Sequence, residues 1–224
     1  MTAPDFADNI ILIGMPGSGK SSLGRRLARQ IGFGFIDSDT VLAAREGQTV
    51  AQLLAACSTG DFIERESAAV RSIRVRRSII ATGGSVVYCP RAMAHLARLG
   101  TIVYLDVPLG ILRQRVGDLA ERGVVSRTGG GLGEIFAERT PLYRRWADFT
   151  WRVPRVGRRE AAERLAALLS EHLPQLISAE TSQSGAKSGT IGHERPATPG
   201  QGRRRRRRRP SRETGGGHGS ETDH

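Results

Sequence analysis

The chain has 224 residues, 38% of them hydrophobic, and its 34 Lys and Arg against 22 Asp and Glu give a formal charge of +12. Two cysteines without CxxC spacing exclude a disulfide framework and a structural zinc site, and fit a reducing compartment. No apolar stretch is long enough to cross a bilayer and no signal-peptide core follows a basic start, so we expect a soluble, cytoplasmic protein.

Apolar runs with strand character alternate with helical patterns along most of the chain. Strands are expected at residues 10–13, 34–36, 78–81, 101–105 and 149–153. Helices are expected at 20–31, 39–46, 49–56, 61–76, 90–99, 108–117, 134–147 and 158–172. This alternation predicts an α/β fold of three layers, in which helices cover both faces of one parallel sheet.

The octet at 14–21, GMPGSGKS, joins the first expected strand to the first helix. Its glycines let the backbone aim successive N–H groups at one anion, and the helix N-terminus adds unpaired donors. Lys20 can then reach the β- and γ-phosphates of ATP, and the Ser21 hydroxyl can hold Mg²⁺. Because strand, loop and helix follow in order, a chance match in a capping loop is the weaker interpretation. The predicted nucleotide-binding residues are Gly17, Ser18, Gly19, Lys20, Ser21 and Ser22.

Two acidic residues, Asp37 and Asp39, follow the second expected strand. Ligands of open parallel sheets bind beyond the carboxyl ends of the strands, so one carboxylate could lie near Mg²⁺ and the other near an acceptor hydroxyl. The alternative is an N-cap pair at the start of the next helix, and both interpretations can hold together.

Two later motifs could border the same site. Gly83 and Gly84 follow the third expected strand, where they would let the backbone approach a small substrate; a plain tight turn is the alternative. Arg139, on the helix at 134–147, could clamp a carboxylate through two hydrogen bonds. Taken alone, Arg139 is better explained as a solvated helix residue, because the chain has many arginines. Between these motifs, the glycine-rich segment 118–133 suggests a mobile lid over the substrate, or else a long surface loop.

Together these motifs resemble the shikimate kinase family of nucleoside-monophosphate-kinase-like enzymes over about residues 9–169. The marks are the glycine-rich octet, FIDSD at 35–39, ATGG at 81–84 and ERTPLY at 138–143, in that order and spacing. The resemblance implies a P-loop kinase fold with a lid. It also implies ATP- and Mg²⁺-dependent phosphorylation of shikimate to shikimate 3-phosphate, within aromatic amino-acid biosynthesis.

The resemblance also assigns roles to single residues. Acceptor binding would fall to Asp39, Gly83, Gly84 and Arg139. Catalysis would fall to Lys20, Asp39 and Arg122. Asp39 would orient the acceptor hydroxyl and could deprotonate it, Arg139 would pair with the acceptor carboxylate, and the lid arginine Arg122 would neutralise the transferring phosphoryl group. Arg115 would flank the adenine, and Asp37 would join Ser21 in organising Mg²⁺.

Three positions depart from the family pattern: Ile63 stands where a carboxylate-binding arginine is usual, Ser85 replaces a third glycine, and the lid reads RGVV at 122–125. Arg65 cannot substitute for the missing cation, because two residues turn a helix by about 200°. An alternative acceptor is therefore another small hydroxy acid or an amino-acid alcohol such as homoserine. Arg139 would hold its carboxylate, while Asp39 or an unpaired Glu66 would face its ammonium.

Composition divides the chain into a predicted kinase domain, 1–177, and a predicted disordered basic tail, 178–224. The tail has ten Lys and Arg against five Asp and Glu, and seven consecutive arginines occupy 203–209. That run suggests contact with a polyanion, but a solvated tail without a partner is the plainer interpretation. In a third hypothesis, the protein binds nucleic acid through the arginine tail and the kinase domain is vestigial. The intact Lys20 and Asp39 argue against it. We expect a monomer.

Overall fold

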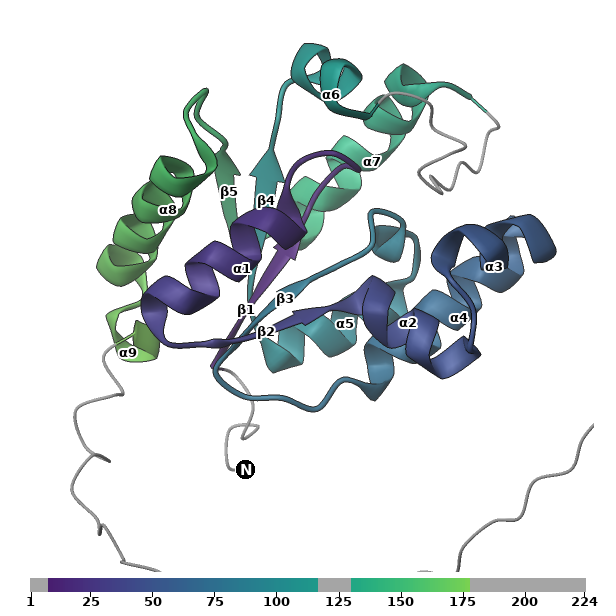
Figure 1. The fold of residues 1–224 in the computed structure, drawn as a ribbon, viewed down its shortest axis with the longest axis horizontal. Coiled ribbons are helices and arrows are strands. Elements are labelled where there is room, and N and C mark those ends of the chain that lie inside the picture. Colours follow the sequence, from purple (N-terminus) through teal and green to yellow (C-terminus); the bar gives the residue numbers. More distant parts are fainter. Residues whose placement is uncertain (1–7, 117–129, 178–224) are drawn as a thin grey trace, which may run out of the picture. The chain divides into compact units, whose positions relative to one another are not determined.

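Five parallel strands form the centre of the fold in a computed structural model, which describes residues 8–116 and 130–177 (Figure 1). The strand order is β2-β3-β1-β4-β5, and every neighbouring pair is parallel. The strands are β1 (Asn9–Ile13), β2 (Gly34–Asp37), β3 (Ser78–Ala81), β4 (Gly100–Asp106) and β5 (Phe149–Arg152). All five predicted strands are confirmed, together with the parallel α/β class.

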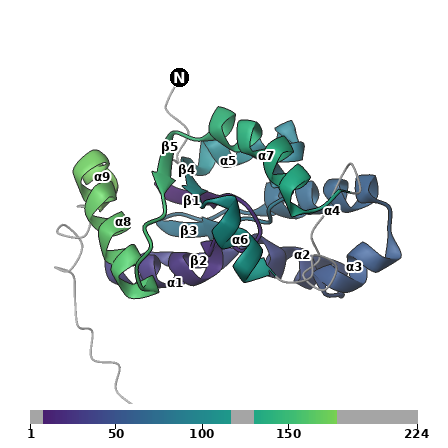
Figure 2. The ribbon, with the colours of Figure 1, turned by 90° about the horizontal axis from the view of Figure 1, so that it is seen from above.

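Helices connect these strands and cover both faces of the sheet. They are α1 (Lys20–Ile31), α2 (Ser38–Glu46), α3 (Val50–Ala56), α4 (Thr59–Ser72), α5 (Pro90–Leu99), α6 (Leu109–Val116), α7 (Leu132–Trp146), α8 (Arg158–His172) and α9 (Pro174–Ile177), with a 3₁₀ turn η1 (Val86–Tyr88). Figure 2 shows α5 and α7 on one side of the sheet and α1 on the other. In the part of the chain that the structure describes, no helix is sufficiently long and apolar to span a membrane.

The sheet separates two hydrophobic cores, and β1 contributes to both. Ile10 and Leu12 pack toward α1 and α8, whereas Ile11 and Ile13 pack toward α4, α5 and α7. All four side chains are buried, as expected for a central strand whose residues alternate between two covered faces. A third, smaller core joins α2, α3 and α4 around Leu42, Leu53, Phe62 and Ala69.

Most predicted helix boundaries lie within two or three residues of the observed ones, but the helix predicted at 61–76 ends four residues earlier than expected. It begins at Thr59, because the Ser58 side chain accepts from the Asp61 N–H and caps the first turn. It ends at Ser72, after which Ile73 is extended and Arg77 has a φ of 46°. The 3₁₀ turn η1 and the short helix α9 were not predicted.

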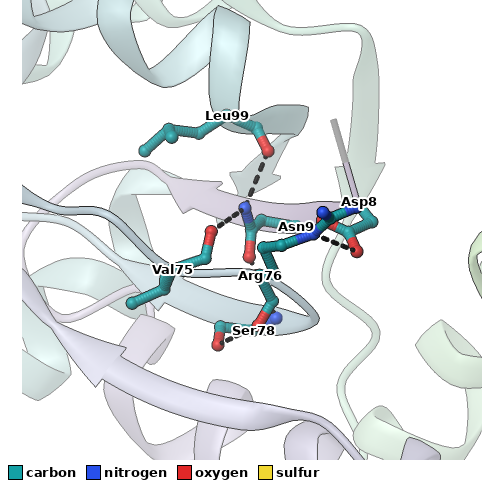
Figure 3. Close-up of polar contacts among 6 residues, drawn as sticks. All are labelled: Asp8, Asn9, Val75, Arg76, Ser78 and Leu99. Atoms are coloured by element: carbon teal, nitrogen blue, oxygen red, sulfur yellow. Dashed lines mark hydrogen bonds and ion pairs between the residues drawn. The ribbon is translucent and has the colours of Figure 1, made fainter. Parts of the chain in front are cut away.

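A buried amide fixes the amino edge of the sheet (Figure 3). The Asn9 Nδ2 donates to the carbonyl oxygens of Val75 at 2.9 Å and Leu99 at 2.8 Å. Its Oδ1 accepts from the Ser78 N–H at 3.0 Å. One side chain thereby joins the start of β1 to the start of β3 and to the end of α5, in a neutral and fully hydrogen-bonded arrangement.

Candidate active site

The carboxyl ends of the parallel strands bring the four sequence motifs to one edge of the sheet. A cleft of about 840 Å³ opens there. It is lined by the P-loop and the start of α1, by Asp39, by the segment at 82–84 after β3, by Arg115, and by residues between 153 and 161. The size suits a nucleotide with a small acceptor, and the position is the usual one for ligands of open α/β sheets.

The P-loop needs glycine at three positions. Gly14 has a φ of 144°, Gly17 of 78° and Gly19 of 97°, values that side-chain-bearing residues rarely adopt. A Cβ at position 17 would also lie only 2.6 Å from Val116 Cγ2 of α6. Gly19 is the N-cap of α1, so the loop delivers its backbone directly to a helix N-terminus, where N–H groups can bind an anion.

Lys20 is the buried cation of this loop. Its Nζ donates to the carbonyl oxygens of Gly14 at 2.8 Å and Met15 at 3.0 Å. Burial lowers the pKa of the ammonium to about 8, although the carboxylate of Asp39 opposes that change. A phosphate group beside Lys20 would supply the negative charge that would raise this pKa again.

Other predicted nucleotide-binding residues also surround the cleft. Ser18, Ser21 and Ser22 line it, and the Ser22 Oγ donates to the Gly19 carbonyl at 3.2 Å. Arg115 lies beside the loop, with its Nη1 3.4 Å from the Gly17 carbonyl oxygen.

One part of the lining was not predicted from the sequence: Val153, Pro154, Val156, Gly157, Arg158 and Ala161. The signal was available, since this segment follows the carboxyl end of the fifth predicted strand.

The N-cap interpretation of the acidic pair is confirmed, and Asp39 also lines the cleft, while the roles toward Mg²⁺ and an acceptor remain predictions. Asp37 is the N-cap of α2, because its Oδ1 accepts from the Asp39 N–H at 3.1 Å. Asp39 reaches the cleft, where desolvation and then the negative charge of Asp37 raise its pKa against the opposing effect of Lys20. Among the described residues, no group of three or more acidic, His or Cys side chains could hold a metal ion. One carboxylate and one hydroxyl, Asp37 and Ser21, nevertheless suit Mg²⁺ whose remaining ligands are phosphate oxygens and water.

Close contacts explain the glycine pair after β3. A Cβ at position 83 would collide with Glu66 Oε1 and come within 2.9 Å of Asp39 Oδ1. One at position 84 would lie 2.9 Å from Arg139 Nη1 and 3.0 Å from a carbon of Pro16. Neither glycine has a positive φ, so the structure favours close approach over an ordinary tight turn.

Side chains from two helices hold this glycine loop in place. The Ser38 Oγ accepts from the Gly83 N–H at 2.9 Å, and the Tyr143 hydroxyl donates to the Gly84 carbonyl at 2.6 Å. The loop is therefore fastened both to the start of α2 and to α7.

Arg139 is not a solvated helix residue; that interpretation was wrong. The side chain is 1% exposed. Its Nε donates to the Tyr88 hydroxyl at 3.1 Å, and its guanidinium carbon lies 4.9 Å from the centre of the Tyr88 ring. This buried cation lies against Gly84, which lines the cleft, although Arg139 itself is not among the lining residues.

Glu66 is not unpaired, which corrects a second expectation. Its Oε2 accepts from the Ser85 hydroxyl at 2.7 Å. Burial raises the pKa of this carboxyl to about 7, and the Ser85 hydrogen bond partly opposes that rise. Ile63, one turn earlier on α4, packs against the small core of α2, α3 and α4. Of the departures from the family pattern, Ser85 is hydrogen-bonded to Glu66, and Ile63 lies one turn before Glu66 on α4.

The lid arginine Arg122, and most of the predicted lid at 118–133, lie outside the described residues. So do the predicted tail and its arginine run at 203–209.

The chain is similar to known proteins over most of the described residues. A family model described as shikimate kinase matches residues 16–170. The shikimate kinase of Nitrosomonas europaea is 36% identical over 167 residues, which cover 73% of this chain and 79% of the relative. That of Neisseria gonorrhoeae is 34% identical over 169 residues, covering 74% and 98%.

Solved structures give the same result. A shikimate kinase from Acinetobacter baumannii in complex with shikimate superposes with a TM-score of 0.64 at 25% identity, over 76% of this chain and 96% of that one. The shikimate kinase of Aquifex aeolicus gives 0.62 at 28% identity, over 74% and 98%.

Proposed function

Because this chain belongs to the shikimate kinase family, we propose that it transfers the γ-phosphoryl group of ATP to the 3-hydroxyl of shikimate. One observation carries the choice of acceptor: the glycine loop lies between a buried guanidinium, Arg139, and a carboxylate, Asp39. A small molecule beside that loop can present a carboxylate to the first and a hydroxyl to the second. The reaction would serve aromatic amino-acid biosynthesis in the cytoplasm.

The P-loop would bind the triphosphate. Backbone N–H groups between Gly17 and Ser21 would surround the phosphates, with Ser22 at the same helix N-terminus and Arg115 beside the adenine. Lys20 would exchange the carbonyls of Gly14 and Met15 for phosphate oxygens. Mg²⁺, held by Ser21 and Asp37, would neutralise charge on the phosphates.

The acceptor would bind between Asp39, Gly83, Gly84 and Arg139. Arg139 would hold its carboxylate, and Asp39 would orient its hydroxyl. As the hydroxyl oxygen bonds to the γ-phosphorus, the bond to the β–γ bridging oxygen breaks and the hydroxyl proton passes to Asp39. Lys20 would stabilise the negative charge on the transferring group, and Arg122 of the lid would add a second cation.

One observation favours a second candidate acceptor, an amino-acid alcohol such as homoserine. Residue 63 is an apolar side chain packed away among α2, α3 and α4, so it adds no second cation for a carboxylate. Losing one charged hydrogen-bonding partner could weaken carboxylate binding by roughly 1.5–3 kcal/mol.

ADP release with Mg²⁺ and ATP tests the two candidates. We expect release that depends on shikimate, absent both without an acceptor and in Lys20→Ala. Homoserine-dependent release with shikimate inert would replace the first proposal by the second.

The tail and the oligomeric state are separate proposals. We place the polyanion-binding capacity in residues 178–224, as an accessory to a monomeric kinase domain at 1–177. Deleting the tail should leave turnover unchanged and abolish retention on heparin. Loss of turnover on deletion would contradict this division, and sedimentation of the full chain would test the monomer.

A further inference from the structure

Glu66 is a buried acid that the proposed mechanism does not use. Its side chain comes from α4 and lies behind the glycine loop, with Oε2 hydrogen-bonded to Ser85 and Oε1 against Gly83. The side of Gly83 that Glu66 contacts is also contacted by Asp39, so the two carboxylate oxygens are no more than about 5 Å apart. Glu66 is therefore close enough to the acceptor end of the cleft for its charge to be felt there.

The partner of Glu66 is neutral. Ser85 donates a hydroxyl, and Ile63, the residue one turn before Glu66 on the same face of α4, is apolar. Charged groups act on Glu66 from three other elements: Lys20 of α1 and Arg139 of α7 favour its ionised form, whereas Asp39 of α2 disfavours it. From η1, which also packs on α4, Tyr88 is hydrogen-bonded to Arg139.

We propose that Glu66 is a positioning residue that determines acceptor specificity: the charge on its carboxylate, held by the Ser85 hydroxyl, governs how tightly a carboxylate-bearing acceptor binds beside Arg139. When Glu66 is ionised, it repels the acceptor carboxylate and partly neutralises the attraction that Arg139 exerts on that carboxylate. When it is protonated it still fills the same space and keeps a hydrogen bond to Ser85. This inference rests on the proposed function for its anionic acceptor.

The sign of the effect follows from the protonation of Glu66. Burial raises its pKa to about 7, so it gains negative charge between pH 6.0 and 7.5. Shikimate remains an anion over that interval, so its KM should rise with pH. The negative charge of ionised Glu66, this close to the acceptor end of the cleft, should raise the KM for shikimate roughly threefold to tenfold. Because the effect is on acceptor binding, the KM for ATP should not follow it.

The experiment measures the KM for shikimate from pH 6.0 to 7.5 at saturating ATP and Mg²⁺. Wild type should show the rise, and Glu66→Gln should show a low KM that does not change with pH. Glu64→Gln removes an exposed carboxylate from the same helix and should retain the wild-type profile. An unchanged slope in Glu66→Gln would overturn the proposal.

Two further variants test the inference if Glu66→Gln does not fold. Ser85→Ala removes the hydrogen bond that lowers the pKa of Glu66, so the rise in KM should move to higher pH. Ile63→Arg introduces a cation one turn away, so the KM should be low and flat. Profiles that coincide with wild type in both variants would overturn the proposal.

A second acceptor separates this inference from the proposed function. If shikimate is inert and homoserine is phosphorylated, its ammonium should be attracted by ionised Glu66. The KM for homoserine should then fall as the pH rises in wild type and stay constant in Glu66→Gln. That result would reject shikimate and retain the role of Glu66, whereas equal profiles in the two proteins would reject that role as well.

Discussion

The two edges of the same sheet bury polar groups in opposite ways. At the amino edge, the buried amide of Asn9 is neutral and makes three hydrogen bonds to backbone groups. At the carboxyl edge, Lys20, Glu66 and Arg139 are buried charge-bearing side chains, and burial displaces the pKa of Lys20 to about 8 and of Glu66 to about 7. The first arrangement satisfies every polar atom of a neutral side chain, whereas the second carries the cost of desolvating ionisable groups, which is characteristic of functional sites.

This difference follows from the architecture. Helices α1 and α2 begin at the carboxyl edge, so their N-terminal N–H groups attract anions there. Cations and acids are useful at that edge despite the cost of desolvating them. At the amino edge, strands begin and connections return, and a side-chain amide satisfies backbone groups that the sheet leaves unpaired. Substitutions at the two edges should therefore separate activity from stability.

The largest effect should come from Lys20→Ala. Removing the cation that faces the phosphates should lower kcat by on the order of a thousandfold or more. The fold should survive, because removing a desolvated charge offsets the loss of its hydrogen bonds to Gly14, Met15 and Ser18. Turnover and thermal unfolding measured on one preparation check both statements. Near-normal turnover would show that the P-loop assignment is wrong.

Asn9→Leu should have the opposite profile. It leaves the Ser78 N–H and the carbonyls of Val75 and Leu99 without their partner, which should lower the free energy of unfolding by about 2–4 kcal/mol. The KM for ATP of the folded fraction should not change. Urea unfolding checks the stability, with the exposed amide substitution Gln48→Leu as the matched control. A loss of stability no larger than in that control would contradict a structural role for Asn9.

Arg139→Met should act on the acceptor alone. It keeps the bulk of the side chain and removes the cation, so the KM for shikimate should rise roughly tenfold to a hundredfold. The KM for ATP should stay within about twofold, because the proposed nucleotide contacts come from the P-loop and Arg115 rather than from Arg139. Equal increases in both constants would mean that the substitution disturbs the whole cleft.

The smallest effect expected is on stability, from Glu66→Gln. The raised pKa, about 7 against an ordinary 4.5, means that the fold favours the protonated acid. That advantage is complete below pH 4.5 and is lost as the pH rises through 7. Glu66→Gln should therefore gain about 1–2 kcal/mol of unfolding free energy over wild type between pH 5 and pH 8. A constant difference over that range would contradict the burial of an ionisable group.

Local patterns predicted the elements and the motifs well, because strand alternation, helical spacing and glycine loops are encoded within short windows. The sequence did not reveal pairings between distant positions. Ser85 reaches Glu66 across 19 residues, Arg139 reaches Tyr88 across 51, and Asn9 reaches Ser78 across 69. These contacts depend on which elements pack together, so Arg139 resembled any exposed arginine and Glu66 seemed to have no partner. The roles of single site residues remain predictions.

The most direct measurement is the identity of the product formed from ATP, Mg²⁺ and shikimate, determined by phosphorus–proton correlation NMR. If Arg139 holds the carboxylate and Asp39 faces the hydroxyl, the phosphorus should couple to the ring proton at position 3, as a stable phosphate monoester. A phosphorylated carboxylate, or no phosphorylated product under conditions in which ADP accumulates, would contradict the proposed arrangement of the acceptor.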